Sequence, residues 1–285
     1  MTPSLDESIA GYLAREIDPA FAARAALILR QLQPAGGGHI LDVGCGRGFY
    51  VNALSTLYPQ AGVIGIDFNA DYVAAAKVQT QNTAVDLGRA DACALPFGAD
   101  AFDAVVCSEV LEHIVEDGAA LAELHRVLGD SGMLLISVPH AKYPFLWDPL
   151  NWILERAFGT HVPAHIWWLA GIWADHVRLY SADEITRSVR AAGFVIEELW
   201  FTTPRCLPFA HFLLYGIGKN IIERGFCTSC NRFGQEEKNS RWISWARRLV
   251  NAFDDPQPIR TESTPSVGIV IKARKGRKEA VSACK

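Results

Sequence analysis

The chain has 285 residues, half of them hydrophobic, which is enough for one large α/β core with insertions. Its 27 basic and 31 acidic residues leave a formal net charge of −4 and an isoelectric point near 6.1, which argues against broad nucleic-acid binding. Seven cysteines are an odd number, and the N-terminus lacks the basic and apolar runs of a signal peptide. We therefore expect no disulfide framework and a cytoplasmic location.

The N-terminal part is predicted to hold two helices within residues 4–32. The second begins at Asp18-Pro19, because aspartate is a good N-cap and proline suits the first helical position. Strands and helices then alternate to about residue 140. This alternation predicts a parallel sheet with helices on both faces.

The segment from Ile40 to Gly48 is the most informative in the chain. A short buried strand ends in glycines at alternate positions, which allow a tight turn and a close approach of backbone N–H groups to a ligand. NAD-binding proteins use a related turn, but Asp42 would repel a pyrophosphate and suits the ammonium of an amino acid. The string resembles the first motif of the class I S-adenosylmethionine (SAM) methyltransferases. This resemblance implies cofactor contacts at Asp42, Gly44, Cys45, Gly46 and Gly48.

Later segments follow in the order of the same family. The resemblance places an acid that ends the second strand, Asp67, at the ribose hydroxyls, and the acid of the third segment, Asp91, at the adenine amino group. An aromatic ring next to the first acid suits an adenine face. The further cofactor contacts implied here are Phe68, Ala92, Ser108 and Glu109.

The implied fold is a Rossmann-like, seven-stranded, mostly parallel sheet with helices on both faces and two helical, aromatic-rich insertions. The fifth strand is expected at Gly132–Pro139, and a helix at Ala182–Ala192 begins after Ser181 and ends before a glycine. Sixth and seventh strands are expected at Phe194–Thr203 and Ser266–Ala273, and the family implies that the seventh runs antiparallel. The expected units are N-terminal helices (1–35), SAM-binding core (36–140), lid insertion (141–180), remainder of the core (181–203 and 266–273), second insertion (204–265) and basic tail (274–285).

Every tryptophan lies between Trp147 and Trp245, outside the predicted cofactor half. The lid insertion follows the fifth strand, on the side where substrates of this family enter. It forms either a helical lid with its own small core or an apolar substrate pocket that also touches a membrane, since aromatic residues favour membrane interfaces. The candidate pocket residues are Tyr143, Trp147, Trp168 and Tyr180.

The second insertion offers two further patterns. Arg241–Phe253 is amphipathic at helical period, with Trp242 and Trp245 opposite arginines, and predicts either a helix packed on the lid or an interfacial helix on an anionic membrane. Cys227 and Cys230 form a lone CxxC, and only Cys206 and His211 lie near them as further zinc ligands. A loop with two free thiols is the simpler interpretation.

Methyl transfer is an in-line displacement that also requires removal of a proton from the acceptor. Histidine titrates in the useful pH range, so the candidate bases are His113, His140 and His176. Each would otherwise be structural.

A more specific pattern overlaps these histidines. Glu109, Glu112 and His113 would share a face if their turn were helical. With His176, they resemble the divalent-metal set of the ubiquinone-pathway O-methyltransferases and the small-RNA 2′-O-methyltransferases. Metal-independent relatives also carry the Ser-Glu-Val-Leu-Glu-His string, so a metal and a metal-free site remain alternatives.

Together these patterns predict a SAM-dependent methyltransferase that acts on an apolar small molecule or lipid-like acceptor, at oxygen, without nucleic acid as partner. The alternatives are carbon or nitrogen methylation of a soluble metabolite or natural product, a SAM-binding scaffold without catalysis, and a Rossmann oxidoreductase. The acceptor and the oligomeric state are not determined by the sequence.

Overall fold

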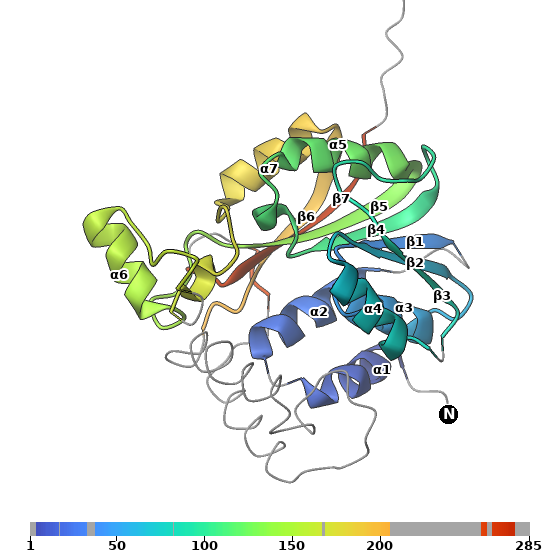
Figure 1. The fold of residues 1–285 in the computed structure, drawn as a ribbon, viewed down its shortest axis with the longest axis horizontal. Helices are drawn as coiled ribbons and strands as arrows, with labels where there is room; N and C mark the ends of the chain where they lie inside the picture. Colours follow the sequence, from blue (N-terminus) through green and yellow to red (C-terminus); the bar gives the residue numbers. More distant parts are fainter. Residues whose placement is uncertain are drawn as a thin grey trace, which may run out of the picture.

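The computed structural model describes residues 4–16, 18–32, 38–81, 83–166, 169–205, 258–260 and 264–276 (Figure 1). Some features predicted from the sequence lie outside these residues: Trp168, Cys227, Cys230, the amphipathic segment Arg241–Phe253, most of the second insertion and the end of the basic tail.

Helices and strands alternate through the described chain. The helices are α1 (Leu5–Tyr12), α2 (Pro19–Gln31), α3 (Phe49–Leu57), α4 (Ala70–Gln79), α5 (Asp117–Val127), α6 (Pro149–Phe158) and α7 (Ala182–Ala191). The strands are β1 (His39–Val43), β2 (Gly62–Asp67), β3 (Val85–Arg89), β4 (Phe102–Ser108), β5 (Leu128–Pro139), β6 (Phe194–Thr202) and β7 (Gly268–Lys275). Short 3-10 turns cover Leu13–Arg15, Leu111–His113 and Gly171–Trp173.

The strands form one seven-stranded sheet in the order β3-β2-β1-β4-β5-β7-β6. The first five strands pair in parallel, and β7 pairs antiparallel with both β5 and β6. This confirms the predicted Rossmann-like sheet and its antiparallel seventh strand. Because the chain moves outward from β1 in one direction and returns to β4 in the other, the carboxyl ends of β1 and β4 border the crevice where open α/β sheets bind ligands.

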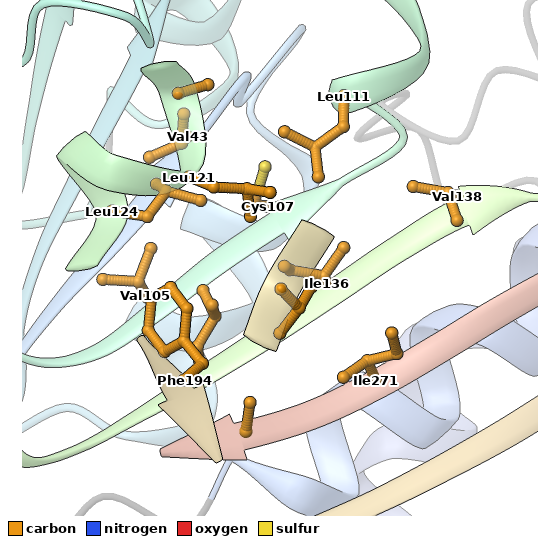
Figure 2. Packing of buried hydrophobic residues seen from close by; sticks show 14 of the residues in the cluster. Val43, Val105, Cys107, Leu111, Leu121, Leu124, Ile136, Val138, Phe194 and Ile271 are labelled. Atoms are coloured by element: carbon orange, nitrogen blue, oxygen red, sulfur yellow. The ribbon is translucent and has the colours of Figure 1, made fainter. Parts of the chain in front are cut away.

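Apolar side chains cover both faces of the sheet. In Figure 1, α5 and α7 lie on one face, and α1, α2 and α3 lie on the other. Figure 2 shows the first of these cores, in which strand residues meet Leu121 and Leu124 of α5. Full burial of one such leucine stabilises the fold by about 1.5–3 kcal/mol. The other core joins α2 and α3 to the sheet, and its members include Ile28, Val51, Leu54, Val106 and Val270.

The helix ends follow the signals in the sequence. Asp18 Oδ1 accepts hydrogen bonds from the backbone N–H groups of Ala20 (3.0 Å) and Phe21 (3.1 Å), which confirms the predicted start of α2. Ser181 and Glu184 form a reciprocal capping box at the start of α7, and Gly193 follows that helix with φ +95°.

One local expectation was wrong, and the condition attached to another is not met. β5 begins at Leu128 rather than Gly132, because Leu128 already pairs with Phe102 of β4. The residues Glu109 to His113 are not one helical turn: Glu109 has φ +56°, and only Leu111–His113 form a 3-10 turn. Glu109 therefore does not share a helix face with Glu112 and His113.

The lid insertion is built around α6, which projects from the body of the fold (Figure 1). The side chain of Asp148 caps α6 at Asn151 (3.1 Å) and also accepts from the backbone N–H of Ile172 (3.0 Å), so it joins the helix to the later 3-10 turn. Large apolar side chains of this insertion are exposed: Phe145, Leu146, Leu150, Ile153 and Phe158. Among the described residues, no helix is both long and apolar enough to cross a bilayer.

Candidate active site

The glycine turn joins β1 to α3 in a left-handed backbone conformation that residues with a Cβ rarely adopt. Gly44, Gly46 and Gly48 have φ values of +71°, +53° and +87°. A Cβ on Gly44 would also collide with the side chain of Val110. The predicted glycine positions are therefore required by the backbone itself.

Asp67, predicted to hold the ribose, already organises this turn. Its Oδ2 accepts from the backbone N–H of Gly46 at 2.8 Å, and its Oδ1 accepts from that of Asn69 at 2.8 Å. Each carboxylate oxygen has lone-pair capacity for a further donor, so ribose hydroxyls could add to these bonds.

Asp42 is an acid inside the fold, 1% exposed. Its Oδ2 has no hydrogen-bond donor among the described residues. Burial, and then the charge of Asp67, raises the pKa of Asp42 to about 8, while the backbone N–H of Val51 opposes this shift. Such a carboxyl favours a donor or cation that arrives with a ligand.

The predicted adenine contacts lie after β2 and β3. The Phe68 ring is 66% exposed, and the Arg89 guanidinium carbon lies 5.4 Å from its centre. Arg89 Nε also donates to the Phe68 carbonyl at 2.9 Å. Asp91 Oδ1 accepts from the Cys93 backbone at 2.9 Å, and Ala92 lies between them. The exposed ring is available to a planar ligand.

A polar chain crosses the ends of β4 and β5. The Ser108 hydroxyl lies 3.3 Å from the Tyr50 hydroxyl and 2.8 Å from that of Ser137. Ser137 donates to Glu109 Oε1 at 3.0 Å, and Glu109 Oε2 lies 3.2 Å from Arg24 Nη1. Sequence reasoning named Ser108 and Glu109 but missed the others. The signals were present, since Arg24 interrupts an apolar helix and Ser137 an apolar strand.

Glu112, His113 and His176 come together although the last is distant in sequence. Glu112 Oε1 lies 3.8 Å from His113 Nε2 and 4.0 Å from His176 Nε2, and the two rings meet edge to face at 4.8 Å. His113 Nδ1 donates to the Asp175 carbonyl at 2.8 Å, which leaves its Nε2 lone pair facing the carboxylate.

Glu112 is the unusual member of this cluster. Its carboxyl is fully buried, and neither oxygen has a hydrogen-bond partner among the described residues. Burial, and then the charge of Glu109, raises the pKa of Glu112 well above its ordinary value. Burial, and then the neighbouring His113, lowers the pKa of His176. These two shifts favour a neutral Glu112 beside a neutral His176, or a cation between them.

Three of the four predicted metal ligands come together in this cluster. One ligand atom each from Glu112, His113 and His176 lie within 4.8 Å of one another. Glu109, the fourth predicted ligand, is outside the set, because its two oxygens pair with Ser137 and Arg24. Two imidazoles and one carboxylate form a ligand set known for zinc and iron sites with open positions.

The third candidate base, His140, lies elsewhere. It is fully buried, and its Nδ1 lies 2.9 Å from the Ser266 hydroxyl. By contrast, 41% of the His113 side chain is exposed. Of the three predicted bases, His113 is the best placed to meet an acceptor.

The predicted pocket residues make internal contacts. Tyr143 is fully buried and donates to Glu155 at 3.0 Å, while Trp147 is 3% exposed. Tyr180 donates to Asp117 Oδ2 at 2.6 Å. A direct contact between these side chains and an acceptor stays a prediction.

Comparison with known proteins gives consistent results. Residues 41–136 match the family described as a methyltransferase domain. A ubiquinone/menaquinone biosynthesis C-methyltransferase of Desulfotalea psychrophila is 30% identical over 168 residues, 56% of this chain and 67% of that protein. An O-methyltransferase of Penicillium expansum is 32% identical over 173 residues, 59% of this chain and 56% of that protein.

Solved structures agree on the fold. Phosphoethanolamine N-methyltransferase 2 of Haemonchus contortus, in complex with S-adenosyl-L-methionine, superposes with a TM-score of 0.56 at 18% identity. The match covers 95% of this chain and 56% of that one. The chain therefore spans little more than half of this protein and of the Penicillium relative.

Proposed function

Because the chain belongs to the class I SAM-dependent methyltransferases, we propose that it methylates a hydroxyl oxygen of an apolar small-molecule or lipid-like acceptor. The observation that carries this proposal is the exposed His113, held by the Asp175 carbonyl, at the same carboxyl edge of the sheet as the glycine turn. The exposed apolar side chains of the lid support an apolar acceptor.

The bound cofactor supplies an electrophilic methyl group on a sulfonium. The chain's own residues then have two tasks. The glycine turn and Asp67 hold the cofactor, so that its methyl faces the acceptor in line. The Nε2 of His113 accepts the proton of the acceptor hydroxyl, since the hydrogen bond from Nδ1 to Asp175 fixes that tautomer.

A divalent cation at Glu112, His113 and His176 is the second form of this proposal. Its support is the buried carboxyl of Glu112, which has no protein hydrogen bond among the described residues. A cation there would lower the pKa of an acceptor hydroxyl, and His113 would then serve as ligand instead of base.

Chelation separates the two forms. If the cation is required, exhaustive dialysis against EDTA abolishes turnover, and magnesium, manganese or zinc restores it. Elemental analysis of the purified chain gives a second readout: wild type retains metal, His176→Ala does not, and the control His125→Ala, on α5, does. Full activity in metal-free protein would show that no cation is required, with His113 as the base and Glu112 and His176 as its neighbours.

Carbon methylation is the second candidate, favoured by the Desulfotalea relative, which is named a C-methyltransferase. Mass spectrometry of a ligand that co-purifies with the chain, followed by turnover with labelled SAM, identifies the acceptor and the methylated atom. A methyl ether is expected. A new carbon–methyl or nitrogen–methyl bond would overturn the proposal in favour of the alternative, and SAM binding with no turnover on the identified ligand would indicate a scaffold.

A further inference from the structure

α6 and the turn before it carry a concentration of exposed apolar side chains. Of the eleven large hydrophobic side chains that are exposed among the described residues, five lie within residues 145–158. We call these five the α6 patch: Phe145, Leu146, Leu150, Ile153 and Phe158. Phe158 is 73% exposed, more than any other of the eleven. A concentration of this kind on one projecting element marks a surface that contacts another partner.

The opposite side of α6 is anchored to the rest of the lid insertion. Asn151 is fully buried, donates to the Ala170 carbonyl at 2.9 Å and accepts from the backbone N–H of Val162 at 2.8 Å. One turn later, Glu155 accepts from the Tyr143 hydroxyl at 3.0 Å. Because these contacts fix one side of the helix, the α6 patch is held on the side that faces solvent, where α6 projects from the body of the fold (Figure 1).

The exposed charges of this segment are positive. Residues 141–165 contain two acids, of which Asp148 is buried and Glu155 has a side chain only 21% exposed. The two cations of the same segment, Lys142 and Arg156, are both exposed. The guanidinium carbon of Arg156 lies 4.2 Å from the centre of the Trp152 ring, so the charge stays on the helix beside the patch. An apolar helix face with basic neighbours is complementary to an anionic lipid surface.

The dimensions of α6 suit a bilayer surface better than a second protein. A helix of ten residues is about 15 Å long and about 10–12 Å wide. That is about half the thickness of the hydrocarbon layer, so the helix can lie in the interface but cannot cross the bilayer. Its footprint is about 150–180 Å². A standard protein interface buries about 800 Å² on each partner.

We propose that the α6 patch docks the protein on the surface of an anionic lipid bilayer, with α6 lying in the plane of the interface. The apolar side chains of the patch enter the boundary of the acyl chains, and Arg156 extends to the phosphate headgroups. This inference goes beyond the proposed function, and its test needs neither SAM nor an acceptor.

Vesicle flotation with the full chain tests the proposal. Wild type is expected to float with vesicles of phosphatidylglycerol and phosphatidylcholine in equal parts, and less with phosphatidylcholine alone. Leu150→Gln/Ile153→Gln/Phe158→Gln is expected to lower partition into the mixed vesicles at least about tenfold, because it removes side chains that enter the lipid. Arg156→Gln is expected to weaken binding to the mixed vesicles about fivefold and to leave binding to phosphatidylcholine unchanged.

The matched control replaces two exposed valines on other elements, Val78 on α4 and Val195 on β6. Val78→Gln/Val195→Gln removes a similar kind of exposed side chain and should float as wild type does. Wild type that stays with the soluble fraction overturns the proposal. A triple variant that floats as well as wild type, or a control that loses flotation equally, also overturns it.

Sedimentation and thermal unfolding, measured in parallel, report on other occupants of the patch. The triple variant is expected to keep the mass and the unfolding temperature of wild type, because its substitutions lie on exposed positions. A wild-type dimer that becomes a monomer in the triple variant would assign the patch to a second copy. A clearly lower unfolding temperature would assign it to contacts within the chain. Either result overturns docking on lipid, and turnover, measured separately, decides the proposed function.

Discussion

A carboxyl group buried as deeply as that of Asp42 stays protonated near neutral pH, because its pKa is raised to about 8. An ammonium beside it favours the ionised form, so binding should lower that pKa. Cofactor binding at pH 7 should therefore release a proton, and the release should fade above about pH 9, where the free protein is already ionised.

This gives the first prediction at the scale of the residue. Calorimetry of S-adenosylhomocysteine binding at pH 7, in buffers of different ionisation enthalpy, should detect up to about one released proton per ligand. Asp42→Asn should remove the release, because its amide does not titrate. Proton release of wild-type size in Asp42→Asn would show that another group titrates.

At the same scale, the sequence identified residues whose role is local. Gly44, Gly46 and Gly48 were predictable because a left-handed backbone is a property of the position itself. The pairing of Glu109 with Arg24 was not, since it depends on a helix that the chain forms far earlier. The contact of His113 with His176 was suggested by a resemblance, and no spacing rule would have found it.

At the scale of elements, Tyr180 connects three of them. Its hydroxyl bonds to Asp117 Oδ2 at the start of α5 (2.6 Å) and to the Leu111 carbonyl in the 3-10 turn (3.3 Å). Its backbone N–H donates to the carbonyl of Pro139, the last residue of β5. Tyr180 therefore joins the end of the lid insertion to the core.

The corresponding prediction tests whether Tyr180 is a joint or a pocket residue. Tyr180→Phe should lower the free energy of unfolding by about 1–2 kcal/mol, because it removes the hydroxyl that bonds to Asp117 and to the Leu111 carbonyl. Denaturant unfolding checks this, with the exposed Tyr72→Phe as a control that changes little. A change in acceptor KM at unaltered stability would place Tyr180 in the pocket instead.

The starts of helices were predictable where capping residues in the local sequence determine them. Asp18-Pro19 and the Ser181–Glu184 capping box begin helices by their own chemistry, so α2 and α7 start where expected. The start of β5 was missed because Leu128 joins the strand by pairing with Phe102 of β4. The sequence around Leu128 does not reveal this pairing. The condition of a helical turn after β4 is not met, because Glu109 has φ +56° and its side chain pairs with Ser137 and Arg24, which lie far from it in sequence.

At the scale of the whole molecule, contact with a membrane stays a prediction, because Arg241–Phe253 lies outside the described residues. If that segment lies on an anionic membrane, the chain should float with anionic vesicles, and added salt should weaken the binding. Trp242→Gln/Trp245→Gln should abolish flotation without adding charge.

The matched control changes two residues on the opposite side of the predicted wheel, Ser244→Gln/Asn251→Gln, which should still float. Thermal unfolding of each variant is measured in parallel. Wild type that stays with the soluble fraction, or a tryptophan variant that unfolds, would assign the segment to the lid.

The position of β7 has a consequence for how the chain folds during synthesis. Among the strands that the structure describes, β6 pairs only with β7, yet β7 follows it after residues 203–267. β7 is the strand that pairs with both β5 and β6. While the ribosome makes that stretch, β5 therefore has an open edge, and β6 has no partner strand yet. Open edges invite pairing with other chains, so the nascent protein is most exposed to aggregation late in translation, after its cofactor-binding half has already emerged.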